Sequence, residues 1–259
     1  MTQLNYSRWT KACVLAGMLA AQLACGNNVF KSGVKKDPAE DSTLALERKN
    51  PSKAIKILEE ALVDDPGNPK YLSILATAYA TRAGIDPLTL GSKFSTSSAS
   101  LLGDSSSTGS ITSLFSVMPA ATADVIKDID YAVSILNGQI PVSDRQPGDA
   151  FKTAIYMTAS MVLHTKALDS RGKGTLTAAD IASLSDADAN AILNNLDAAA
   201  ALLAANGAAP GVSSAAASET AAAALAKYST QIDAAEGTTK AEKLRNYLAA
   251  NPGATAKSS

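Results

Sequence analysis

Apolar residues recur at intervals of three and four positions along most of the chain. This spacing places side chains on one face of an α-helix. Between residues 50 and 65 the apolar stripe consists of Ala54, Leu58, Ala61 and Leu62. The pattern predicts a helix with one buried face.

Turn and capping residues divide this part of the chain into short helices. An Asn-Pro pair stands at residues 50–51 and again at 68–69. Asn is a favoured N-cap, and Pro at the first helical position loses no intrahelical hydrogen bond. Asp-Pro-Gly at 65–67 ends the first helix, and Gly84 ends the second. The second helix carries the stripe Leu72, Leu75, Ala76 and Tyr79. Residues 41–48 could form a helix before both.

Helical patterns continue after a stretch at 92–113 that is rich in Ser, Gly and Thr and reads as a flexible loop. Residues 119–136 carry one apolar stripe, whereas 149–168 are apolar over most of the circumference and therefore predict a central helix. Ala-rich helices are expected at 185–206 and 218–236, separated by Gly-Ala-Ala-Pro-Gly at 207–211. Thr239 and Glu242 form a capping box that opens a last helix, which ends at 251–253.

Composition supports an all-α fold. Hydrophobic residues make up 46% of the chain and charged residues 18%, so a folded core is expected. Aromatic residues make up only 5%, and Ala is abundant in the second half. Small side chains favour close helix packing over a β-sandwich, which needs β-branched and aromatic residues.

The charge balance argues against nucleic-acid binding. The formal net charge is −1, and residues 1–24 contain Arg8 and Lys11 but no acidic residue. Without them, 21 basic residues stand against 24 acidic ones. No basic stripe remains that would neutralise a run of phosphates.

The N-terminus has the pattern of an export signal. Arg8 and Lys11 precede the apolar and small residues of 12–24. This run is shorter than the roughly 20 residues that span a bilayer. A basic start, a short apolar segment and small residues before a cut are typical of a secretory signal. The alternative is a buried N-terminal helix.

Leu23-Ala24-Cys25-Gly26 resembles the lipobox of bacterial lipoproteins. The resemblance implies cleavage before Cys25 and lipidation of its thiol, and Gly26 after the Cys implies sorting to the outer membrane, facing the periplasm. The alternative is cleavage after Ala21 or Ala24, which would give a soluble periplasmic protein.

Lipidation also explains the cysteine usage. Cys13 lies within the signal, so Cys25 would be the only cysteine of the mature chain and no intrachain disulfide could form. The expected organisation is a signal peptide at 1–24, a tether at 25–41, a helical domain at 42–252 and a disordered tail at 253–259.

The helices at 50–65 and 68–84 resemble the tetratricopeptide repeat in their alternation of small and large apolar residues and in the Pro at the turn. They match the second helix of one repeat and the first helix of the next. Tetratricopeptide-like hairpins are therefore expected to precede an Ala-rich C-terminal bundle. The resemblance implies partner contacts on the exposed face of the helix at 69–84. The residues it nominates are Lys70, Ser73, Thr77 and Thr81.

His164 is the only histidine. A lone His could act as a general base, but no Cys or carboxylate accompanies it at helical spacing, so a structural role is expected. A pocket that brought His164 together with a carboxylate would favour an enzyme.

Residues 169–180 resemble an EF-hand calcium loop, with Asp169 and Asp180 at the first and last positions. Arg171 and Lys173 stand where oxygen ligands belong and would repel Ca²⁺. The alternative is a link between two helices in which Thr177 and Asp180 form a capping pair. No metal or cofactor is expected, apart from the lipid on Cys25.

These features predict a lipid-anchored periplasmic adaptor or scaffold that binds a protein or peptide and could self-associate. No phosphate-binding Gly loop, zinc spacing or nucleophile elbow is present, so an enzyme is not expected. The alternative function is a solute-binding accessory of a transporter, because the interrupted helical pattern looks similar to the T components of TRAP transporters.

Overall fold

The computed structural model describes residues 37–87, 89–90, 111–146, 148–206 and 215–251. All regular secondary structure in these ranges is helical, which confirms the all-α prediction. The helices belong to one compact unit that begins at Pro38. The expected signal peptide, Cys25 and the tail at 253–259 lie outside the described residues and stay predictions.

The first three helices of the described residues each begin with Pro at the first helical position: α2 (Pro38–Glu47), α3 (Pro51–Asp64) and α4 (Pro69–Arg82). The Asn50 side chain accepts a hydrogen bond from the amide of the third helical residue at 3.1 Å. Asn68 accepts bonds from the second and third amides of α4 at 3.0 and 3.2 Å. Both predicted helix starts are confirmed, since these caps satisfy amides that have no partner within the helix.

The helical domain starts earlier than predicted. Residues 38–41, which the sequence assigned to the tether, form the first turn of α2. Ala39 in this turn is only 1% exposed, and Ser42 is buried after it. The correction follows from Pro38, whose fixed φ suits a first helical turn, and from the burial of Ala39.

Between residues 111 and 146 the chain forms one α-helix of 12 residues and three short non-α segments, of which the 3₁₀-helix η5 (Val142–Asp144) is the last. A 3₁₀-helix, η3 (Ile111–Val117), begins within the predicted Ser-rich loop, most of which lies outside the described residues. Helix α6 (Ala123–Ser134) starts later than the predicted residue 119, because the Thr122 hydroxyl caps it by accepting from the amide of its third residue. A π-helical turn, η4 (Ile135–Gln139), follows directly.

Helix α7 (Asp149–Ala167) is the central helix, as its apolar circumference predicts. Most of its side chains are buried, including polar ones such as Thr158 and Ser160. It packs against α6 on one side and α9 (Asp186–Asn206) on the other, and also contacts η3.

The C-terminal part consists of α8 (Ala178–Ala182), α9, α10 (Ala215–Asp233) and α11 (Lys240–Ala250). Capping boxes open α8 and α11, as predicted. Helix α9 packs against α10 and α11, and α11 also contacts α8. The predicted break at 207–211 lies outside the described residues.

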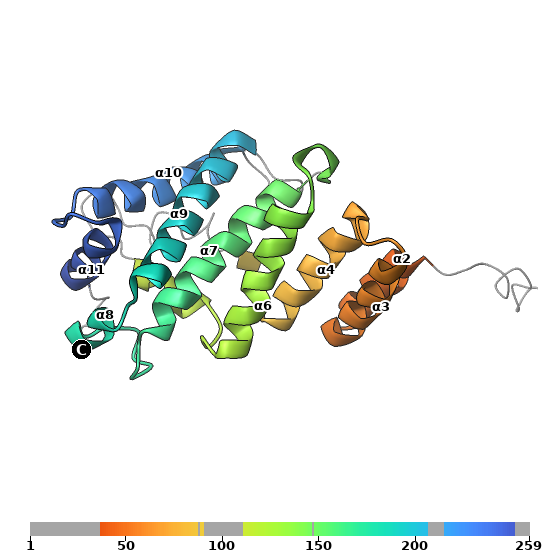
Figure 1. Ribbon diagram of the computed structural model, residues 1–259, viewed down its shortest axis with the longest axis horizontal. Coiled ribbons are helices and arrows are strands. Elements are labelled where there is room, and N and C mark those ends of the chain that lie inside the picture. The colour runs from red at the N-terminus through yellow and green to blue at the C-terminus, as the bar shows by residue number, and fades with distance from the viewer. Residues whose placement is uncertain (1–36, 88, 91–110, 147, 207–214, 252–259) are drawn as a thin grey trace, which may run out of the picture. The chain divides into compact units, whose positions relative to one another are not determined.

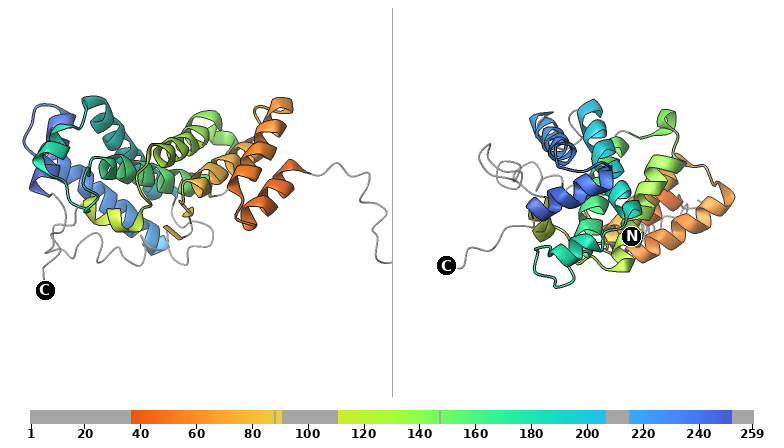
Figure 2. Two further views of the ribbon diagram at one scale, coloured as in Figure 1. Left: turned by 90° about the horizontal axis from the view of Figure 1, so that it is seen from below. Right: turned by 60° about the vertical axis from the view of Figure 1, so that its left-hand side comes forward.

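Within this unit the helices pack largely in chain order (Figures 1 and 2). Contacts link α2 to α3, α3 to α4, α4 to α6, α6 to α7, and α7 to α9, and α2 additionally touches α4. Their buried residues form one continuous apolar cluster. In the described ranges, no helix combines the length and apolar character needed to cross a membrane.

Candidate binding groove

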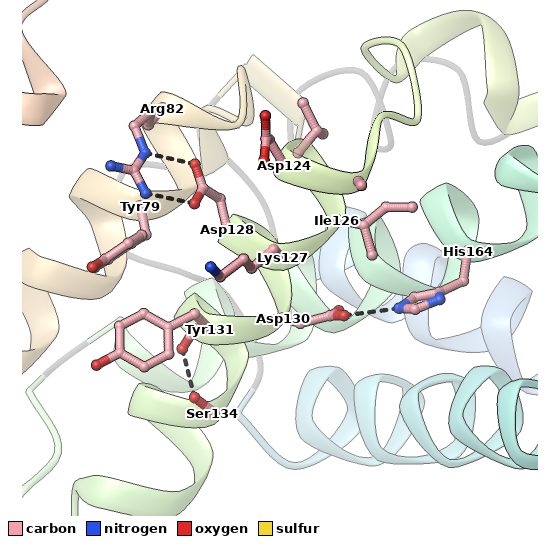
Figure 3. A pocket seen from close by; sticks show the side chains of 12 residues that line it. Tyr79, Arg82, Asp124, Ile126, Lys127, Asp128, Asp130, Tyr131, Ser134 and His164 are labelled. Carbon is pink, nitrogen blue, oxygen red and sulfur yellow. Dashed lines mark hydrogen bonds and ion pairs between the residues drawn. The ribbon is translucent and has the colours of Figure 1, made fainter.

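The outer face of α6 forms the floor of an open groove of about 1160 Å³, bordered by α4 and α7 (Figure 3). We call it the α6 groove. Several of its floor residues, among them Asp124, Lys127 and Tyr131, are exposed, so it is open to solvent rather than enclosed. The lining residues are Tyr79 and Arg82 from α4, Ala123, Asp124, Val125, Ile126, Lys127, Asp128, Asp130, Tyr131 and Ser134 from α6, and His164 from α7.

An ion pair fixes the α4 side of the groove. Arg82 donates from Nε and Nη2 to the two carboxylate oxygens of Asp128, each at 2.6 Å. This bidentate geometry is the strongest arrangement available to a guanidinium and a carboxylate. The hydrogen bonds to Asp128 raise the pKa of Arg82 against the opposing effect of desolvation. Asp128 is buried, and Arg82 neutralises its charge.

Two tyrosines continue this border. The Tyr79 and Tyr131 rings meet edge to face with centroids 4.7 Å apart, and the Arg82 guanidinium lies 4.7 Å from the Tyr79 centroid. The Tyr79 hydroxyl donates to Glu59 on α3 at 2.6 Å. Desolvation and then this bond raise the pKa of Tyr79, so the phenol stays neutral at physiological pH. The Tyr131 side chain is held at the ring edge but remains 41% exposed.

A polar network fixes the α7 side. His164 Nε2 lies 2.9 Å from Asp130 Oδ2, and Ser160 donates to Asp130 Oδ1 at 2.6 Å. Asn195 on α9 in turn donates to the Ser160 hydroxyl at 3.1 Å. The network therefore joins α6, α7 and α9 behind the groove.

The structure meets the condition that would favour acid–base chemistry, a pocket that contains His164 and a carboxylate. The hydrogen bond to Asp130 raises the pKa of His164, although desolvation acts in the opposite direction. Ser160 is fully buried and donates to the carboxylate rather than to the imidazole, so His164 does not activate it as a nucleophile. This arrangement can bind and release a proton but does not form a Ser-His-Asp relay.

Other polar groups on the groove floor have no partner among the described residues. The Asp124 carboxylate, the Lys127 ammonium and the Tyr131 hydroxyl make no hydrogen bond or ion pair there. Asp124 and Lys127 lie along α6 between the two fixed borders, and Tyr131 lies at the α4 border beside Tyr79 (Figure 3). The groove thus combines an ordered frame with polar groups that are available to a ligand.

The sequence-nominated contact residues lie on α4, outside the lining of the α6 groove. Lys70 is exposed at the start of the helix. Ser73 is only 5% exposed, donates to Asp149 at 2.6 Å and accepts from the Lys152 ammonium at 2.6 Å. The expected exposure of Ser73 is therefore wrong, because the Asp149 and Lys152 side chains from the start of α7 bond to its hydroxyl. A role of these residues in partner binding stays a prediction.

Thr77 and Thr81 are half-buried. Each donates its hydroxyl to the carbonyl one turn earlier in α4, at 3.0 and 2.7 Å respectively. Such bonds satisfy the hydroxyls within the helix, which leaves Lys70 as the fully exposed member of the nominated set.

The groove residues escaped the sequence reasoning because their partners are distant in the chain. Asp128 follows Arg82 by 46 positions, and Asp130 precedes His164 by 34. Helical spacing around His164 relates it only to residues of its own helix, none of which is a carboxylate at that spacing. A carboxylate on a neighbouring helix has no local signal.

The carboxylates of the EF-hand-like segment at 169–180 accept hydrogen bonds from other residues of the same segment. Asp169 accepts a hydrogen bond from the Gly174 amide at 2.6 Å. Asp180 accepts from Ser170 and from the amide and hydroxyl of Thr177, and these bonds hold the pKa of Asp180 well below its usual range. The predicted capping pair is confirmed. In the part of the chain that the structure describes, no group of three or more potential metal ligands was found.

Comparisons with protein-family models, with curated proteins and with solved structures found no match. The α6 groove and the predicted N-terminal anchor are therefore the features that bear on function.

Proposed function

We propose that the protein is a lipid-anchored adaptor of the bacterial cell envelope that holds a segment of a partner protein in the α6 groove. The groove carries this proposal, because its borders are fixed by internal bonds while three polar groups that line it make no hydrogen bond or ion pair with the described residues. Preorganised borders lower the entropic cost of binding. The lipobox-like sequence at Cys25 supports the anchor.

The order of helix contacts supports a tetratricopeptide-like arrangement for the N-terminal part. Helix α2 contacts both α3 and α4, and α4 then contacts α6. We assign α2 and α3 to a first repeat and α4 to the first helix of the next, in agreement with the sequence spacing. In repeat proteins of this kind each unit packs mainly on its neighbours and leaves an extended surface for a partner.

An extended ligand fits the groove better than a small solute does. Small-molecule sites enclose most of the surface of their ligand, whereas Asp124, Lys127 and Tyr131 are exposed along an open floor. The groove runs from α4 across α6 to α7, so a peptide segment can touch both borders at once. We therefore favour the adaptor over the solute-binding alternative.

Site-specific photo-crosslinking tests the adaptor. A photoreactive phenylalanine replaces Tyr131 in the groove, and a control replaces Val63, which is 79% exposed on α3. After irradiation of intact cells, we expect one recurrent partner segment attached at position 131 and none of it at position 63. Cys25→Ser should remove the lipid, as intact mass would show, and release the protein from the membrane. Equal capture at both positions, or no capture at 131, would refute the groove as the binding site.

A catalytic function is the second candidate, because His164 and Asp130 share the groove. His164 would act as a general base through the ring nitrogen that Asp130 does not engage. A panel of ester and amide substrates with the purified protein and His164→Gln tests this role. Turnover that vanishes in the variant would support it, and equal rates would exclude it.

A further inference from the structure

We infer that the segment held in the α6 groove is basic, with Lys or Arg side chains that pair with Asp124 and Asp130. This inference rests on the proposed adaptor function. It follows from the carboxylates at the groove, of which one is paired with a cation of the protein and two are not.

The three groove carboxylates differ in their partners. Asp128 is neutralised by Arg82 through two hydrogen bonds. Asp124 makes no ion pair with the described residues, and Asp130 is bonded by Ser160 and by His164, both uncharged when the imidazole is neutral. Each oxygen of Asp130 retains a second lone pair, and the side chain is 41% exposed.

Residues beside the groove add further negative charge. Glu59 is bonded by the neutral Tyr79 hydroxyl, and Asp188 on α9 is bonded by Ser185. Asp188 is close enough to act electrostatically on His164. Against these carboxylates, Lys127 is the single cation on the described groove lining without an ion pair. The electrostatic potential at the groove is therefore negative, and a negative surface attracts and orients a positively charged partner.

The exposed ring of Tyr131 favours the same ligand. Tyr131 is 41% exposed, and its ring lies beside Tyr79 on the α4 side of α6, away from the Asp130 carboxylate (Figure 3). While one cationic side chain of the segment pairs with Asp130 on the α7 side, a second can lie over this ring on the α4 side and gain a cation–π contact. Tyr79, in contrast, already carries the Arg82 guanidinium.

His164 makes the binding dependent on pH. Its ring contacts Asp130 on α6, and Asp188 on α9 acts on it electrostatically. When the ring takes up a proton, the imidazolium neutralises Asp130 and competes with a cation of the partner. Affinity for a basic segment should therefore fall as the pH drops from 8 to 5.

Defined peptides test the inference. Three peptides of about twelve residues share a Leu and Tyr framework and carry Arg, Gln or Glu at the remaining positions. Their affinity for the full mature protein is measured by fluorescence anisotropy. We expect the Arg peptide to bind about tenfold more tightly than the Gln peptide and the Glu peptide to bind most weakly, with a preference that shrinks as salt rises.

Matched variants locate the effect. Asp124→Asn and Asp130→Asn should weaken the Arg peptide several-fold, and Lys127→Gln should strengthen it. Asp64→Asn and Lys227→Gln, which make the same charge changes at exposed positions outside the groove lining, should not alter it. Asp124→Asn breaks no hydrogen bond to the described residues, so it guards against an effect of misfolding.

The outcomes separate this inference from the adaptor proposal. Tighter or equal binding of the Gln or Glu peptide, no binding of any of the three, or equal effects of the control variants would overturn the basic segment. In each case a partner segment crosslinked at position 131 would still support the adaptor. Absence of that crosslink would instead remove the adaptor itself.

Discussion

The buried carboxylate of Asp149 provides a sharp test of how α4 is joined to α7. Its side chain is 1% exposed and accepts three donors: the Ser73 hydroxyl at 2.6 Å, the Lys152 ammonium at 2.7 Å and the Gln146 amide at 2.7 Å. Asp149→Ala removes all three contacts and leaves an ammonium beside an apolar side chain. We expect a substantial loss of stability.

The magnitude follows from the burial of the pair. Breaking a buried ion pair from one side costs about 3–5 kcal/mol. Lys152 is 23% exposed and can regain part of its hydration, so the lower half of that range, about 3–4 kcal/mol, applies. For a domain of this size the loss corresponds to a fall in Tm of roughly 6–16 °C. Asp149→Asn keeps an oxygen acceptor and should cost less.

Urea denaturation followed by circular dichroism measures the effect. A double-mutant cycle with Lys152→Met should show a coupling energy of about 1–2 kcal/mol, because the two side chains share one network. Ser73→Ala should lose about 1 kcal/mol and leave partner capture at Tyr131 unchanged. A loss below about 1 kcal/mol for Asp149→Ala, or strict additivity with Lys152→Met, would refute the structural role given to this cluster.

Three further results are expected. Arg82→Met should lower the free energy of unfolding by about 1–3 kcal/mol, since it leaves the buried Asp128 carboxylate unpaired; an unchanged urea midpoint would contradict this. Folding raises the pKa of His164, so protonated His164 stabilises the folded protein fully at a pH below about 6.5, the pKa of an unfolded histidine. This stabilisation is lost as the pH rises through the pKa of the folded protein. The urea midpoint of the wild type should therefore fall as the pH rises from about 6.5 through the folded pKa, and that of His164→Gln should fall much less. Gly237→Ala should destabilise the protein, because Gly237 has φ +142° and an added Cβ would lie 2.9 Å from the backbone nitrogen of Lys243. Gly67→Ala is the control, since a Cβ there has no atom within 4 Å. Equal melting temperatures for the two variants would refute the steric argument.

Local signals in the sequence placed the helices well. The Asn caps at 50 and 68 and the Thr239 capping box act within one helical turn, so their effect can be read without knowledge of the fold. The central position of α7 followed from an apolar circumference that only a surrounded helix can bury. The start of α6 was misplaced, because Thr122 competes with Pro119 as a helix start and provides the side-chain cap.

The groove, in contrast, depends on which helices become neighbours. The pairs Arg82–Asp128 and His164–Asp130 each join two different helices, and no spacing along the chain predicts them. The same reason explains Ser73, which the repeat-like pattern placed on an exposed face. Two side chains from the first turn of α7, Asp149 and Lys152, reach the Ser73 hydroxyl and make it part of a buried polar cluster.

The chain-order packing of the helices also has a kinetic consequence. Contacts run from α2 to α3, α4, α6, α7 and α9 in chain order, so most loops that must close during folding are short and folding should be fast for a protein of this length. Opening should begin at the outer helices, which among the described elements have neighbours on one side only. Amide hydrogen exchange would then be most rapid in α2 and slowest in α7, whose buried length supports its neighbours on both sides. The α6 groove lies between these extremes, and a bound partner segment would join α4 and α7 and so slow the exchange of the intervening helix.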